Sequence, residues 1–297
     1  MRRQVLVSEN MAESILVNGL ITSGVYALLA VGFSLIFGVA RIVNLAHTAF
    51  YMLAAYLVFT FTSRLGLPIP LSICLSVVSV AIVGMLSYQI VIDRLRGHEA
   101  TILIATIAIA LIIQESMLLA YGSSATPAIR LITGYQQILG VKVFYRELVA
   151  FGVAIILLAV TWAILMKTRL GIAIRSTAQD REIANLMGIN VTRTGMITMG
   201  IALVLAAIAG AVVESTARPF MWMSPLVTVL AIVVLGGLGS IKGSFIAAFI
   251  LGFVETIVTV MISEQAYLKE AVALAFMLAV ILMRPEGLFG VRFEEER

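Results

Sequence analysis

Three carboxylic acids lie within or near the ends of long apolar segments of this chain: Glu115, Glu214 and Glu255. An ionised group is costly in hydrocarbon, so an acid in such a position usually has a function or a partner. Glu115 and Glu255 lie deeper, where they could relay protons, line a solute route or fix helix packing. Glu214 lies near a segment end and close to Arg218, which suits an ion pair at the membrane interface.

Three polar residues, Asn18, Asn44 and His47, also occur in apolar surroundings. Such side chains either line a route through the membrane or hydrogen-bond across helices. His47 and His98 are far apart in the sequence, and Cys74 is the single cysteine. This spacing does not suit a metal site, and no Ser-His-Asp or Cys-His arrangement has supporting context. The chain is therefore expected to be non-catalytic and to bind no cofactor of its own.

A glycine-rich segment from residue 236 to residue 244 superficially resembles a phosphate-binding loop. That loop requires Gly-Lys-Ser/Thr, whereas this chain has Lys242-Gly243-Ser244 between apolar segments. The glycines are expected to allow close helix packing and a tight turn instead. They are Gly236, Gly237, Gly239 and Gly243. If the protein uses ATP, the ATPase must be another chain.

The composition is that of an integral membrane protein. Of its 297 residues 61% are hydrophobic and 12% charged, and the mean hydropathy is +1.09. Soluble domains are roughly half apolar and a quarter charged. The pI of about 9.4 fits basic cytoplasmic loops, so no nucleic-acid partner is expected. The first apolar run lacks a signal peptide's cleavage site and predicts a retained helix.

The hydropathy pattern predicts an all-α polytopic membrane protein with about 8–10 transmembrane helices in a single domain, residues 1–297. The segment at 223–238 is short and runs into glycines, which predicts a broken or re-entrant element. The nine apolar segments cover roughly 15–37, 42–62, 69–92, 101–121, 145–166, 195–215, 223–238, 243–262 and 268–283.

The loop at 167–194 is the longest polar interruption of the chain. Its basic residues place it in the cytoplasm, which gives an outside N-terminus and an inside C-terminus unless an extra half-membrane element reverses the N-terminus. These residues are Lys167, Arg169, Arg175, Arg181 and Arg193. The longest outside loop, 122–144, could receive a partner, cover a pathway entrance or simply connect two helices.

Within the cytoplasmic loop, residues 177–187 predict a short amphipathic helix. Ser176 or Thr177 would cap its start, and Asp180 and Glu182 would lie in its first turns, where acids suit the helix dipole. Ile183, Leu186 and Met187 fall on one face, with Ala184 beside them. Gly188 would end the helix in a left-handed conformation. The helix could lie on the membrane surface, but its balanced charge better suits a groove on another protein.

Three motifs near the start of the chain are Asn18-Gly19-Leu20, Gly24-Val25-Tyr26-Ala27-Leu28 and Asn44-Leu45-Ala46-His47-Thr48. Later in the chain come the polar segments 171–182 and 186–190 and the glycine-rich segment 234–241. Together these motifs resemble the LivH-type permeases of ABC importers for branched-chain amino acids, and the segments 171–182 and 186–190 resemble the cytoplasmic coupling segment of that family. The resemblance spans nearly the whole chain in order. One departure is His47-Thr48, where the family usually has His-Gly.

The resemblance implies an ABC importer permease fold in the inner membrane, with a coupling helix near 177–188. It implies a LivM-type second permease, or a second copy of this chain, and two cytoplasmic ATP-binding subunits that hold ATP and Mg. An extracytoplasmic binding protein would deliver the solute. The residues expected to contact an ATPase are Thr177, Ala178, Gln179, Asp180, Arg181, Glu182, Ala184, Leu186, Met187 and Gly188.

Leucine, isoleucine and valine are the expected solutes, and urea, short amides or aromatic acids are alternatives within the same family. Two readings from other classes remain open at this point. One is a secondary transporter coupled to protons through Glu115 or Glu255, and the other is a passive channel for a small solute. Neither requires a surface that docks an ATPase.

Overall fold

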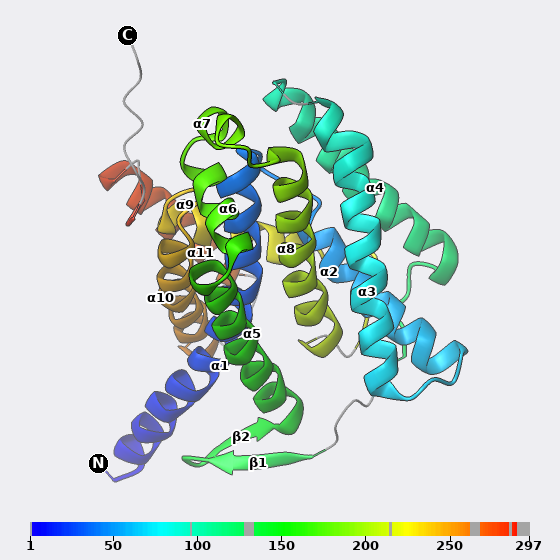
Figure 1. Cartoon of the computed structure of the whole chain (residues 1–297). Helices are drawn as coiled ribbons and strands as arrows, with labels where there is room; N and C mark the ends of the chain where they lie inside the picture. The colour runs from blue at the N-terminus through cyan, green and yellow to red at the C-terminus, as the bar shows by residue number, and fades with distance from the viewer. Residues whose placement is uncertain are drawn as a thin grey trace.

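The computed structural model describes residues 2–95, 97–127, 134–213, 216–261, 268–284 and 287–289. These residues form a helical bundle with one short β-hairpin (Figure 1). The helices are α1 Arg2–Ala40, α2 His47–Phe59, α3 Ile69–Ser87, α4 Glu99–Tyr121, α5 Tyr145–Lys167, α6 Arg169–Gln179, α7 Arg181–Leu186, α8 Val191–Val213, α9 Met223–Gly236, α10 Ile241–Met261 and α11 Leu268–Met283. The strands are β1 Tyr135–Ile138 and β2 Val141–Phe144, and π-helical or 3-10 turns cover Thr60–Arg64, Tyr88–Ile92 and Asp93–Leu95.

The all-α polytopic class is confirmed. Within the described residues, 6 helices are long and apolar enough to cross a membrane. Helix α9, with 14 residues, is too short to span the hydrocarbon core. Helix α2 has 13 residues and continues into the π-helical turn Thr60–Arg64, but it is not among the helices that are long and apolar enough to span, and nearly all of its residues are buried. The expected segments 42–62 and 223–238 are therefore short helices inside the bundle. The long spans lie in α1, α3, α4, α5, α8 and α10.

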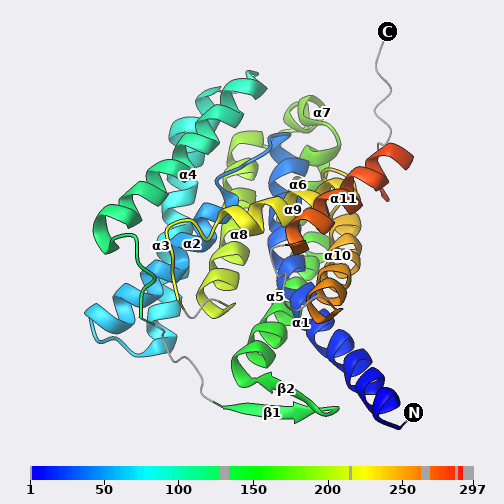
Figure 2. The ribbon, with the colours of Figure 1, turned by 180° about the vertical axis from the view of Figure 1, so that it is seen from behind.

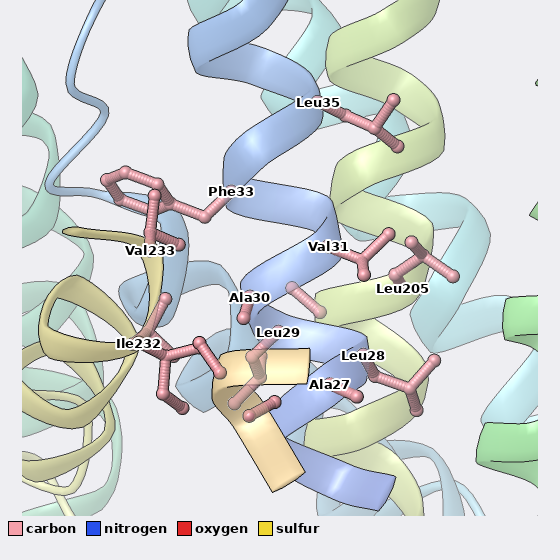
Figure 3. Packing of buried hydrophobic residues seen from close by; sticks show 14 of the residues in the cluster. Ala27, Leu28, Leu29, Ala30, Val31, Phe33, Leu35, Leu205, Ile232 and Val233 are labelled. Carbon is pink, nitrogen blue, oxygen red and sulfur yellow. The ribbon is translucent and has the colours of Figure 1, made fainter. Parts of the chain in front are cut away.

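Helix α1 is the centre of the bundle and packs against α10, α8, α5 and α9. A helix that is apolar all round must be buried on every side, and the sequence from Ala27 to Leu35 has this character. Figure 3 shows Phe33 and Val31 leaving α1 in opposite directions, toward Val233 of α9 and Leu205 of α8 respectively. In the most apolar window of α1, 72% of the residues are buried.

Helices α3, α4 and α5 lie at the periphery. The buried share of their apolar windows is only 22% for the α3 segment and 28% for each of the other two. Their outward faces carry exposed apolar side chains, among them Ile104, Ile112 and Ile156. Lipid tails or neighbouring apolar subunits can cover such faces without a solvation cost.

The two ends of the bundle differ. Helix α7 lies at one end, and the hairpin of β1 and β2 lies at the opposite end (Figures 1 and 2). The strands are antiparallel, with Tyr135 opposite Phe144. Leu139 and Gly140 between them both have positive φ, at 50° and 75°, as expected for a two-residue hairpin turn. We call these the α7 end and the hairpin end.

Candidate docking and transport sites

The segment at the α7 end is built from two helices. Asp180 separates α6 from α7, with an extended backbone at φ −150° and ψ 119°. Its side-chain oxygen accepts a hydrogen bond from the backbone N–H of Ile183 at 2.9 Å. The predicted single helix over 177–187, capped by Ser176 or Thr177, is therefore wrong in its start. Asp180 is itself a strong N-cap residue, and Thr177 lies buried inside α6.

Helix α7 presents an apolar face that the described chain does not cover. The exposed fractions are 59% for Ile183, 84% for Leu186 and 78% for Met187, whereas Ala184 is buried. The helix ends at Gly188, whose φ of +85° is left-handed. Glu182 lies in its first turn. Three large apolar side chains held outward on a capped helix form an exposed apolar patch, and patches of this kind commonly mark contacts with another protein.

Two arginines connect this segment to the end of the central helix. The guanidinium of Arg181 donates to the carbonyl oxygen of Ala40 at 3.0 Å. The guanidinium of Arg41 donates to the carbonyl oxygen of Ala178 at 3.0 Å. Since Ala40 is the last residue of α1 and Ala178 belongs to α6, the contacts tie α7 to the core of the bundle.

Glu255 is buried in α10 and accepts hydrogen bonds from two other helices. The Tyr26 hydroxyl of α1 donates to its Oε2 at 2.6 Å, and the Thr228 hydroxyl of α9 donates to its Oε1 at 3.0 Å. The carboxyl group thus joins three helices. Hydrogen-bonded acids of this kind satisfy a buried polar group and fix helix packing.

Glu115, unlike Glu255, is not buried between helices. It is exposed on the outer face of α4, where its Oε1 accepts a hydrogen bond from the Gln114 side chain at 3.1 Å. Gln114 in turn accepts from the Trp222 indole N–H at 2.8 Å. Helices α4 and α10 lie on opposite sides of the bundle in both views (Figures 1 and 2), so the structure does not bring Glu115 and Glu255 together.

Asn44, just before α2, and His47, its first residue, are also buried. Asn44 accepts from the backbone N–H of Ala46 at 3.1 Å, and its amide contacts the Met199 sulfur at 3.6 Å. His47 stands edge-on to Phe33, with ring centroids 5.8 Å apart. Asn18 is half-buried nearer the hairpin end of α1, well removed in sequence from the other two. Glu214 lies outside the described residues.

The glycine-rich segment joins α9 to α10 by close backbone contact. A Cβ on Gly236 would lie 2.4 Å from the carbonyl carbon of Gly243, and one on Gly243 would lie 2.0 Å from the Gly236 oxygen. Gly237 and Gly239 form the intervening turn with φ values of +97° and +82°. Any side chain at 236 or 243 would separate the two helices.

Sequence reasoning missed the partners of these residues. Tyr26 and Thr228 were not identified as hydrogen-bond donors to Glu255, and Arg41 was not connected with the 167–194 loop. Tyr26 and Glu255 are separated by 229 positions, and Arg41 and Ala178 by 137. No pattern in a single sequence encodes such pairings.

The fold and these features define a multi-pass membrane protein with an exposed apolar face on the short helix α7. Comparison with known proteins identifies the family of this membrane protein. Residues 15–281 match the family described as the permease component of branched-chain amino acid transport systems. The chain belongs to this family and is a permease subunit of an ABC importer, in the inner membrane.

Among curated proteins, the chain is 28% identical to the high-affinity branched-chain amino acid transport permease BraD of Pseudomonas aeruginosa, over 93% of this chain and 94% of that protein. It is 26% identical to LivH of Escherichia coli K12, over 92% and 94% respectively. A solved structure, PsaBC from Streptococcus pneumoniae in complex with Fab, has a similar fold. The TM-score is 0.54 at 18% identity, with 92% of each chain covered.

Proposed function

We propose that this chain carries branched-chain or other hydrophobic amino acids across the inner membrane, driven by ATP hydrolysis on partner subunits. Its family and its relatives BraD and LivH support this solute class, since both relatives are named as branched-chain amino acid permeases. In this proposal an extracytoplasmic binding protein delivers the solute. The chain pairs with a LivM-type permease or with a second copy of itself.

The exposed apolar face of α7 is the observation that carries the proposal. Leu186 and Met187 are among the most exposed large hydrophobic residues of the described chain, and they lie in a polar loop rather than in one of the long apolar helices. A groove on a cytoplasmic ATPase would cover them. The α7 end is accordingly the cytoplasmic end, which agrees with the basic residues of its loop.

The connection between α7 and α1 supplies the coupling route. ATP and Mg bind to the ATPase partners, and this chain itself holds no cofactor. Closure of the ATPases moves α7, and the hydrogen bonds of Arg181 and Arg41 pass the movement to the end of α1. Because α1 packs against four other long or buried helices, its displacement favours a different arrangement of the bundle.

Transport in membrane vesicles tests the proposal. Vesicles containing the complete transporter, loaded with ATP and supplied with the binding protein, are expected to concentrate radiolabelled L-leucine. A protonophore should leave this uptake intact. Uptake that needs no ATP and collapses with the proton gradient would identify a secondary transporter instead, and purely downhill flux would identify a channel.

A further inference from the structure

A cavity of about 530 Å³ opens between helices near the hairpin end. Its walls come from α1, α2, α5, the end of α8 and the beginning of α9. Pockets that hold small ligands usually measure about 300–1,000 Å³. The cavity therefore has room for one small solute, at the end opposite the docking helix.

Charged groups of both signs line one part of this cavity. Arg146 and Glu147 lie in the first turn of α5, and Arg218 lies in the connection that leads to α9. Arg218 is exposed, and Arg146 and Glu147 are half-buried. Glu147 is held in place because its Oε2 accepts a hydrogen bond from the backbone N–H of Phe144 at 3.2 Å. Among the described residues, two cations and one anion thus line the cavity.

Apolar groups line another part. Val25 and Leu29 of α1 lie on the wall with Met221, and both α1 residues are buried in the bundle. Both lie in the interior of α1, whereas Arg146 and Glu147 lie in the first turn of α5 and Arg218 lies outside any helix. The cavity thus combines a charged region at the hairpin end with an apolar region further inside.

We infer that this cavity binds one free α-amino acid with an apolar side chain. The carboxylate contacts Arg146 and Arg218, the ammonium group contacts Glu147, and the side chain lies against Val25 and Leu29. This inference rests on the proposed function and adds a site for its solute. Carboxylate recognition by arginine is strong because the hydrogen bonds are charge-assisted. Urea or a simple amide offers neither charge, so the lining favours the zwitterion among the family's solutes.

The site also has a route to the core of the bundle. Tyr26 lines the cavity, and its hydroxyl donates a hydrogen bond to the buried Glu255 at 2.6 Å. A solute that displaces the Tyr26 ring must alter this hydrogen bond. Solute binding in the cavity is therefore expected to change how α1 packs against α10, since Tyr26 and Glu255 connect these two helices.

Cysteine protection tests the inference in vesicles containing the complete transporter. Cys74→Ser removes the native thiol, and Ser224→Cys adds one to the cavity lining. A negatively charged, membrane-impermeant methanethiosulfonate should label this cysteine from the hairpin side. L-Leucine should slow labelling roughly tenfold at about ten times its Kd, because the free fraction falls as 1/(1 + [L]/Kd). Leucinamide, which lacks the carboxylate, should protect far less.

Matched variants define the controls. Ser123→Cys, exposed near the same end but outside the cavity lining, should be labelled at a rate that leucine does not change. Arg146→Gln should raise the leucine concentration that halves the labelling rate by roughly tenfold, because the variant loses a charge-assisted contact with the carboxylate. Lys142→Gln removes an exposed cation of β2 outside the lining and should leave protection unchanged.

Uptake in the same vesicles distinguishes failure of the cavity assignment from failure of the proposed function. If leucine is transported but does not protect Ser224→Cys, or if that cysteine is inaccessible, the cavity assignment is wrong and the proposed function stands. If vesicles with unmodified transporter accumulate no branched-chain amino acid, the proposed function fails first.

Discussion

Arg41 and Arg181 each donate a hydrogen bond to the backbone of the segment that carries the other. Arg181 bonds the carbonyl of Ala40, next to Arg41, and Arg41 bonds the carbonyl of Ala178, close to Arg181. Arg41 has a left-handed backbone, with φ 56°, and ends the central helix. The segment of α6 and α7 and the end of α1 therefore share two charged hydrogen bonds at the α7 end of the bundle.

Removing this pair should uncouple ATP hydrolysis from transport. Arg41→Ala with Arg181→Ala is expected to lower leucine uptake by roughly tenfold or more, since a hydrogen bond to a charged group contributes about 1.5–3 kcal/mol. The amount of transporter in the membrane and its ATPase rate should change much less. Arg175→Ala, an exposed arginine of α6, is the matched control. Equal loss of uptake in that control would contradict a specific role for the pair.

Gly188 tests whether the end of α7 depends on backbone conformation. A Cβ there meets nothing within 4 Å, so substitution costs only the left-handed φ, about 1–2 kcal/mol for an ordinary residue. Gly188→Val should reduce uptake, whereas Gly188→Asn should retain most of it because Asn tolerates this conformation. Gly152→Val in α5 is the control, because that glycine also has open space but an ordinary φ. The uptake rates of the three variants show whether transport depends on the left-handed backbone at position 188.

The contact between α9 and α10 predicts a severe defect from a single methyl group. Gly236→Ala would place a Cβ 2.4 Å from the backbone of Gly243, and backbone cannot move aside as a flexible side chain can. We expect the variant to lose most of its folded yield in detergent, measured by size-exclusion chromatography of a fluorescent fusion. Gly152→Ala should match the unmodified protein. Normal yield and normal uptake for Gly236→Ala would mean that the helices separate freely.

Glu255 distinguishes a packing role from proton coupling. Glu255→Gln retains a side-chain oxygen for one of the two donors, Tyr26 or Thr228, and should keep substantial uptake. Glu255→Leu leaves both hydroxyls without their acceptor and should lower the thermal stability, since an unsatisfied buried group costs about 1–3 kcal/mol. Uptake and the unfolding temperature are measured for both variants. Complete loss of transport in a stable Glu255→Gln protein would favour proton coupling.

The sequence predicted the class of fold and most helices well, because long apolar runs directly reflect burial in a bilayer. The runs at 101–121 and 145–166 differ by only a few residues from α4 and α5. Length was harder to judge for 42–62, since hydropathy does not reveal that α2 ends at Phe59 and continues as a π-helical turn. The 223–238 segment forms the short helix α9, which ends at Gly236, and its re-entrant course stays a prediction.

Local chemistry was only partly predictable. The exposed face of Ile183, Leu186 and Met187 followed from helical spacing, but the choice between Thr177 and Asp180 as cap depended on packing. Thr177 is buried within α6, which removes it from the role. The hydrogen bond from Tyr26 to Glu255 depends on how α1 crosses α10, and a single sequence carries no record of that crossing.

Site-specific crosslinking at Leu186 tests the central claim most directly. A photo-crosslinking amino acid at this position, in native membranes containing the complete transporter, is expected to capture an ATP-binding subunit. The yield should change between the ATP-bound and nucleotide-free states. The same photo-crosslinking amino acid in place of Leu119 of α4, which is also highly exposed, should not capture that subunit. Capture of lipid or of a second copy of this chain at Leu186, without any ATPase, would contradict the proposed docking role of α7.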